Sequence, residues 1–136
     1  MLMRIKIKIG KTEVFVALTK TPTAEKIWKA LPFESRAEVW GQEVYFPVPV
    51  SAALESGARE VVEPGTVCFW TQGSCLALPY GPTPVSKGSE CRLADPCNMI
   101  GKLEDDPQAL RSVCVGDTVR AVRATGNSKH RGGRNR

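Results

Sequence analysis

Few residues in this chain of 136 could carry out covalent chemistry. The only histidine, His130, lies near the C-terminus, so the body of the chain offers no histidine as the general base of a Ser-His-Asp arrangement. The sequence contains no phosphate-binding loop of the Walker or dinucleotide type, and no Gly-x-Ser-x-Gly elbow. Hydrolase, kinase and dehydrogenase chemistry therefore all lack the residues that they need.

Aromatic side chains with polar groups are the better candidates for a functional site. Trp40, Tyr45, Trp70 and Tyr80 each combine a large apolar surface with a hydrogen-bonding group, which suits a groove for a peptide or a small ligand. The same residues could instead plug the ends of a barrel. Glu43 lies beside them and could act as an acid or a base, although a lone carboxylate at a hairpin is usually a solvated surface group.

The five cysteines do not form a metal-binding or disulfide pattern. None of them is part of a Cys-x-x-Cys pair, and zinc sites usually require such closely spaced ligands. An odd number of cysteines without a secretion signal also argues against a disulfide framework. We therefore expect no metal and no cofactor, and we interpret the cysteines as small core residues with at most one exposed thiol: Cys68, Cys75, Cys91, Cys97 and Cys114.

The net charge of +5 is concentrated at the C-terminus. Residues 125–136 carry four basic residues and no acidic one, which leaves fifteen basic and fourteen acidic residues for the body. This Gly-, Asn- and Arg-rich segment has no large apolar side chain, so we expect a disordered tail after a domain that spans residues 1–124. Because the body is nearly neutral, only this tail is a candidate for contact with RNA, with an acidic partner or with a membrane surface.

Size and hydropathy predict a single cytoplasmic domain. With 42% hydrophobic residues, 136 residues can form one well-buried core and are too few for two typical domains. The longest apolar runs are far below the ~18 residues needed to cross a bilayer. The first residues lead into alternation rather than into the apolar block of a signal peptide. Either a monomer or a homodimer is compatible with these features.

Periodicity then predicts the elements that must position the candidate residues. Alternation over residues 4–18, interrupted at Gly10 and Lys11, predicts a hairpin. A single helix is predicted over residues 22–31, because Thr21 can cap it, Pro22 can occupy its first position and apolar residues recur with helical spacing. Pro32 ends this helix.

The rest of the chain is predicted to be mainly β. Gly and Pro separate short alternating or apolar runs, with one possible helical turn near residues 107–111 and polar loops over residues 51–58 and 85–95. About eight short, mostly antiparallel strands with one helix favour a closed or nearly closed β-barrel, since closure removes unpaired edges. The predicted strands after the helix cover residues 33–40, 43–48, 59–62, 66–70, 75–78, 97–103 and 118–123.

Several of these segments together resemble the small prokaryotic cyclophilin-like proteins, which are mostly uncharacterised. The resemblance covers nearly all of residues 3–124 and implies a compact barrel related to that of the proline isomerases. Two departures from the usual family sequence, at residues 71–72 and 79–80, alter the rim of any pocket. The resemblance rests on segments 32–35 (PFES), 40–46 (WGQEVYF), 64–70 (PGTVCFW), 80–84 (YGPTP) and 98–102 (NMIGK).

The resemblance also suggests one catalytic candidate. Prolyl isomerisation must lower a barrier of ~18–20 kcal/mol, and a donor to the twisted amide can do this without covalent chemistry. In cyclophilins this donor is an arginine on the strand after the first helix, and Arg36 lies on such a strand with Trp40 on the same side. The simpler alternative is an exposed ladder of charges that Arg36 forms with Glu34 and Glu38.

The sequence thus supports two hypotheses. The first is a barrel that binds a peptide or a small molecule in an aromatic pocket around Trp40, Glu43, Tyr45, Trp70 and Tyr80. The second is a weak peptidyl-prolyl cis-trans isomerase that uses Arg36. The orientation of the Arg36 guanidinium, into an apolar pocket or toward its acidic neighbours, would separate them.

Overall fold

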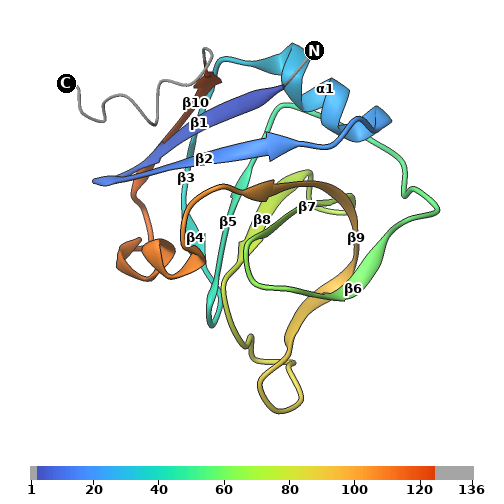
Figure 1. Ribbon diagram of the computed structural model, residues 1–136, viewed down its shortest axis with the longest axis vertical. Helices are drawn as coiled ribbons and strands as arrows, with labels where there is room; N and C mark the ends of the chain where they lie inside the picture. Colours follow the sequence, from blue (N-terminus) through green and yellow to red (C-terminus); the bar gives the residue numbers. More distant parts are fainter. Residues whose placement is uncertain (1–2, 125–136) are drawn as a thin grey trace.

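The computed structural model describes residues 3–124, and the predicted basic tail at 125–136 lies outside these described residues. It is mainly β, as predicted, and one short α-helix accompanies the strands (Figure 1). The strands are β1 (Arg4–Ile9), β2 (Thr12–Leu18), β3 (Phe33–Arg36), β4 (Glu38–Val39), β5 (Glu43–Pro47), β6 (Arg59–Val62), β7 (Thr66–Trp70), β8 (Cys75–Pro79), β9 (Cys91–Leu103) and β10 (Thr118–Arg123). The helices are α1 (Pro22–Ala30) and the 3-10 helix η1 (Pro107–Ser112).

The strands form one antiparallel sheet that rolls into a nearly closed barrel. Nine strands follow the order β3-β10-β1-β2-β9-β7-β8-β5-β4, and β6 pairs with β9 outside this path. The two ends of the path, β3 and β4, are separated along the chain by Ala37 alone. The covalent chain therefore joins the two ends of the sheet, and few strand edges remain open.

The predicted strand over residues 33–40 is divided at Ala37. The amide of Ala37 donates to the carbonyl of Asp117 and its own carbonyl accepts from the amide of Gly116, both at 2.8–2.9 Å. These are the last bonds between this segment and the region of β10, and the next two residues, Glu38 and Val39, pair with β5 instead. This division is why the structure has ten strands, whereas nine segments, or about eight short strands, are predicted from the sequence.

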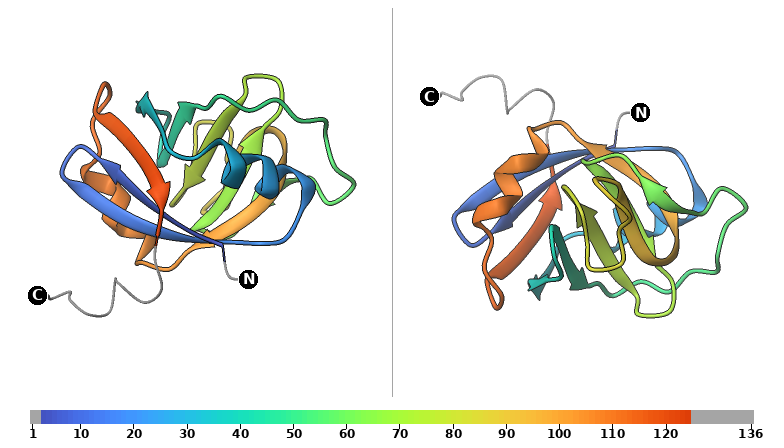
Figure 2. Two further views of the ribbon diagram at one scale, coloured as in Figure 1. Left: turned by 90° about the horizontal axis from the view of Figure 1, so that it is seen from above. Right: turned by 90° about the horizontal axis from the view of Figure 1, so that it is seen from below.

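Helix α1 lies across one end of the barrel (Figure 2). The side chain of Thr21 accepts a hydrogen bond from the amide of Ala24 at 3.1 Å, and Pro22 opens the first turn, as the sequence predicts. The helix ends at Ala30, one residue before the predicted end, because Leu31 is extended as the residue before a proline usually is. Among residues 3–124, no helix is long and apolar enough to cross a membrane.

A buried asparagine fastens this end of the barrel. The side chain of Asn98, on β9, donates to the hydroxyl of Thr23 and to the carbonyl of Ala53, both at 2.9 Å, and accepts from the amide of Glu55 at 2.8 Å. Asn98 is completely buried, so these bonds replace those it would make with water. One side chain thus holds the start of α1 and the loop after β5 against the sheet.

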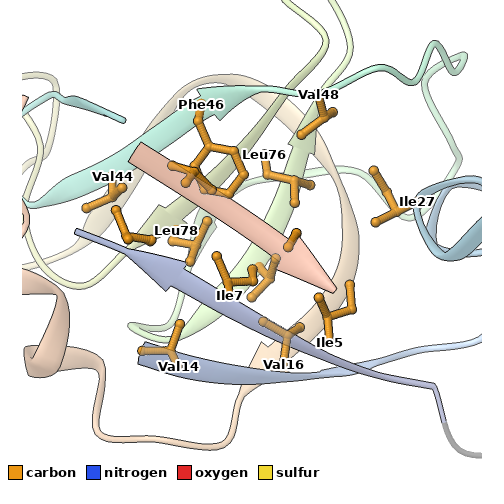
Figure 3. Close-up of a cluster of buried hydrophobic side chains, with 14 of the residues drawn as sticks. Ile5, Ile7, Val14, Val16, Ile27, Val44, Phe46, Val48, Leu76 and Leu78 are labelled. Atoms are coloured by element: carbon orange, nitrogen blue, oxygen red, sulfur yellow. The ribbon is translucent and has the colours of Figure 1, made fainter. Parts of the chain in front are cut away.

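The barrel interior contains the main hydrophobic core (Figure 3). Alternate residues of β1, β2, β5 and β8 point inward from opposite walls, and Ile27 of α1 closes one end. Each of the labelled side chains is less than 10% exposed, and their burial is the main source of stability for the fold. The labelled residues are Ile5, Ile7, Val14, Val16, Ile27, Val44, Phe46, Val48, Leu76 and Leu78.

Strand β9 is longer than the sequence predicts. It begins at Cys91 rather than at residue 97, so part of the predicted polar loop belongs to the sheet. Its first half pairs with β6, whereas its second half pairs with β7 and β2 after a bend that is visible in Figure 1. The first half of β9 is therefore free to cover a face of the sheet outside the main core.

Candidate functional site

The strands β5, β8 and β7 are buried on both faces. Val44 and Phe46 of β5 point into the barrel. Glu43 and Tyr45 alternate with them along the strand and therefore face the opposite side. The register places Tyr45 opposite Ala77 of β8. These outward residues form a second surface that is distinct from the main core.

A second, smaller hydrophobic cluster covers part of this outward surface. The first half of β9 and the neighbouring β6 supply side chains that pack against those of β7 and β8, and Tyr45, Trp70 and Met99 pack at its border. Because the cluster is small, it leaves a recess between β9 and the sheet rather than filling the space. Its buried members are Val62, Cys68, Ala77, Cys91, Leu93 and Cys97.

This recess is a pocket with a volume of about 160 Å³. It is smaller than the ~300–1,000 Å³ of sites that enclose drug-sized ligands, so it fits a group of a few atoms or the end of a side chain. Four of the residues singled out from the sequence meet in its wall, three of them from residues 40–45 and the fourth, Trp70, from β7. The lining residues are Trp40, Glu43, Tyr45, Trp70, Cys75, Ala77, Leu93, Ala94 and Cys97.

Glu43 is the one ionisable carboxyl group in the wall of this pocket. It is only 6% exposed, so the solvated surface position that is usual for a hairpin carboxylate is not the one observed. Its Oε1 atom is buried and has no hydrogen-bond partner among the described residues. Burial raises the pKa of Glu43 from 4.5 to about 7, because the charged form loses its hydration. Near neutral pH this group can therefore accept a hydrogen bond, balance a positive charge or donate a proton.

Trp70 is held in place as a wall of the pocket. Its indole Nε1 donates to Oδ2 of Asp95 at 3.0 Å and to Oε1 of Gln72 at 3.1 Å. The ring also lies against Gly73, where the Cβ atom of any other residue would collide with it. Two hydrogen bonds and one glycine thus fix the indole before any ligand arrives.

Tyr45 and the nearby thiols are kept in their neutral forms. The pKa of Tyr45 is raised, first by burial and then by the charges of Glu38, Cys75 and Glu43. Burial, followed by the charges of Glu43 and Asp95, raises the pKa of Cys97 to about 12.

The other cysteines follow the same pattern. Cys68, Cys75 and Cys91 also have raised pKa values with burial as the main cause, so none of these thiols is an activated nucleophile. All five cysteines are free, and Cys114 alone is exposed, which confirms the prediction of small core residues with one exposed thiol. Within residues 3–124, no three His, Cys, Asp or Glu side chains are grouped so that they could hold a metal ion.

Tyr80 lies outside the pocket wall. It follows β8 with the same parity as Leu76 and Leu78, so its ring enters the main core, where it is 8% exposed. Its carbonyl accepts a hydrogen bond from the side chain of Gln108 at 2.9 Å. Tyr80 is therefore part of the main core and not of the pocket wall.

Arg36 also lies away from the pocket. It is exposed on β3, and its guanidinium donates to the carbonyl of Gly116 at 3.1 Å. Glu34, its neighbour on the same strand, pairs instead with Arg120 at 2.9 Å. The break between β3 and β4 at Ala37 lies between Arg36 and Trp40, which the alternation in the sequence puts on the same side.

Little in the sequence indicates that β9 contributes a wall of the pocket. Cys75 and Ala77 could have been placed by parity, since they alternate with the core residues of β8. Leu93, Ala94 and Cys97 fall in or beside a stretch that is polar and contains glycine, and this composition is typical of a loop. In this stretch only Cys91 and Leu93, on either side of Arg92, follow the alternation of a strand, and two residues are too short a pattern to predict one.

The model of the cyclophilin-like family matches residues 3–122. The chain belongs to the cyclophilin-like family. The solution structure of a hypothetical protein from Archaeoglobus fulgidus is also similar to this cyclophilin-like chain, with a TM-score of 0.78 and 35% sequence identity. The superposition covers 90% of this chain and 95% of the archaeal one. A search of curated proteins finds no match.

The resemblance in sequence sets residues 71–72 and 79–80 apart from the family's usual sequence, and one of them affects the pocket. Gln72 does not line the pocket, but it accepts the hydrogen bond from Trp70 that helps to orient the indole. Tyr80 instead faces the main core of this cyclophilin-like protein.

Proposed function

We propose that this cyclophilin-like protein binds a small molecule, or the end of a peptide side chain, in the pocket between β9 and the sheet. One observation carries the proposal: a buried carboxyl oxygen of Glu43 in the pocket wall lacks a hydrogen-bond partner among the described residues. A buried polar atom without a partner costs about 1–3 kcal/mol, and more when the group is charged. A ligand that donates a hydrogen bond to Glu43 would recover this energy.

The rest of the wall supports the same proposal. Trp40, Tyr45 and Trp70 provide apolar surface around the carboxyl group, and such a combination of apolar walls with one polar group is typical of ligand sites. Because Trp70 is already held by Asp95 and Gln72, binding does not have to order it.

Binding is tested by adding a library of charged and neutral fragments to the 15N-labelled protein. Fragments are expected to shift amide resonances of β5, β8 and β9 around the pocket. Ala94→Phe adds a ring at an exposed position in the pocket wall, and it should remove these shifts without disturbing the core. Ala109→Phe adds the same ring at an exposed position on η1 and should leave them unchanged. If no fragment shifts the pocket resonances of the wild type, the proposal is wrong.

The isomerase alternative gains no support from this geometry. Its candidate donor, Arg36, is exposed and bonded to the carbonyl of Gly116, whereas the pocket wall contains no arginine among the described residues. Isomerase activity therefore stays a prediction from the family resemblance, and its test is direct measurement.

A further inference from the structure

The chemistry of the pocket wall narrows the class of ligand. Three electron-rich rings, those of Trp40, Tyr45 and Trp70, line a recess whose ionisable carboxyl group belongs to Glu43. The faces of such rings carry negative electrostatic potential and attract cations within about 6 Å. Rings of this kind around a carboxylate form the type of cage that recognises quaternary and alkylated ammonium groups.

The charges near the pocket have the same sign. Asp95 accepts the hydrogen bond from the indole of Trp70, and Glu38 lies close enough to raise the pKa values of Tyr45 and Cys75. Among the described residues that line the pocket there is no lysine, arginine or histidine. The pocket is therefore acidic and lacks a positive charge of its own.

We infer that the pocket recognises an organic cation of the alkylammonium class, whose positive group lies among the three rings and faces Glu43. This inference rests on the proposed function, since it specifies the ligand of that same pocket. An alkylammonium group that keeps an N–H would donate a hydrogen bond to the buried Oε1 atom of Glu43, and a quaternary one would balance the charge of its carboxylate. An anionic ligand would meet Glu43, Asp95 and Glu38 without a compensating charge.

The size of the pocket agrees with a headgroup rather than a large molecule. A volume of about 160 Å³ accommodates a compact group, and the remainder of a ligand would extend past the exposed Ala94 into solvent. The pocket could thus hold either a free small ammonium compound or an alkylated lysine side chain of a peptide, because both present the same group.

Recognition of a cation makes affinity depend on pH. At pH values above about 7 Glu43 is ionised in the free protein, whereas at lower pH a cation must first displace its proton. Cation affinity should therefore increase as the pH rises through this range. The side chains near Glu43 that have raised pKa values and stay neutral there are Tyr45, Cys68, Cys75, Cys91 and Cys97, and the other carboxyl groups near the pocket are those of Glu38 and Asp95.

Choline and 3,3-dimethyl-1-butanol provide a matched pair of probes, since they have nearly the same shape and differ in charge. NMR titration of the full chain at pH 8 is expected to give an affinity for choline about tenfold higher than for the neutral alcohol. The preference should decrease in Glu43→Gln, which keeps the shape of the side chain and leaves the three rings in place but removes the carboxylate charge. Choline affinity of the wild type should fall when the pH is lowered to 5.5, whereas that of the alcohol should not.

Each other outcome is decisive. Equal or tighter binding of the alcohol would overturn the cation inference and leave the pocket as a ligand site. The same conclusion follows if neither probe binds while other fragments still shift the pocket resonances. If no fragment binds at all, both the cation inference and the proposed ligand-binding function are wrong. Ala94→Phe, which leaves Glu43 in place, separates a blocked pocket from a fold damaged by Glu43→Gln.

A trimethyllysine peptide tests the two sources of the ammonium group. Tighter binding of this peptide than of choline, with shifts that continue from the pocket over the surface of β9, would identify a peptide side chain as the ligand. Equal binding of the two would identify the headgroup alone as the recognised feature.

Discussion

Replacing Glu43 with glutamine should remove a pH-dependent loss of stability. The pKa of Glu43 rises from 4.5 to about 7 on folding because of burial. Each pKa unit corresponds to about 1.4 kcal/mol, so ionising this group costs the folded state about 3 kcal/mol. That is a large part of the 5–15 kcal/mol by which a domain of this size is typically stable.

The sign of the effect follows from the protons bound in each state. Below pH 4.5 the carboxyl group is protonated in both states and ionisation costs nothing. Between pH 4.5 and 7 the folded protein keeps a proton that the unfolded chain has lost, so the stability of the wild type falls as the pH rises. Above about pH 7 the full cost is present. Glu43→Gln cannot ionise and should lack this dependence.

Urea denaturation of both proteins between pH 4 and pH 8.5 measures the effect. The difference in unfolding free energy between variant and wild type should change by about 3 kcal/mol in favour of Gln across this range, and other titrating groups cancel in that difference. Glu13→Gln, which removes an exposed carboxylate from β2, serves as the control and should show no comparable change. A difference for Glu43→Gln that is constant with pH would refute the buried, unpartnered carboxyl.

Three further predictions concern other parts of the chain. Asn98→Ala should destabilise the protein by about 2–4 kcal/mol in urea denaturation, because it leaves the amide of Glu55 and the carbonyl of Ala53 without their partner, whereas Thr23→Val should cost less. Arg36→Ala should leave any isomerisation of Xaa-Pro peptides unchanged in a coupled protease or NMR exchange assay, and a loss of activity would instead favour the isomerase hypothesis. Deleting residues 125–136 should abolish any salt-dependent binding to RNA or DNA, and binding that persists would mean that the body carries it.

The fold could be predicted from the sequence because its signals are local. Alternation identified the hairpin of β1 and β2, and capping residues identified the start of α1 at Pro22. Parity also placed Val44 and Phe46 in the core. These features depend on residues that are close together in the chain, so local patterns of residue types predict them.

The candidate site was only partly predictable because its walls are brought together by long-range contacts. Trp40, Tyr45 and Trp70 could be selected by residue type, but the burial of Glu43 depends on the first half of β9, some fifty residues later in the chain. Nothing near Glu43 in the sequence indicates this cover. Arg36 lies away from the pocket for a similar reason, since its strand pairs with β10, more than eighty residues later in the chain, whereas the strand that follows Ala37 pairs with β5.

The position of β10 has a consequence for how the chain can fold during synthesis. This last strand, Thr118–Arg123, lies between β1, the first strand to be made, and β3. Until it leaves the ribosome, β1 and β3 each expose an unpaired edge on that side, and such edges invite association with other chains. The nascent protein therefore completes its barrel only when residues 118–123 have been translated, and a chain that stops before residue 118 would be left with two open edges.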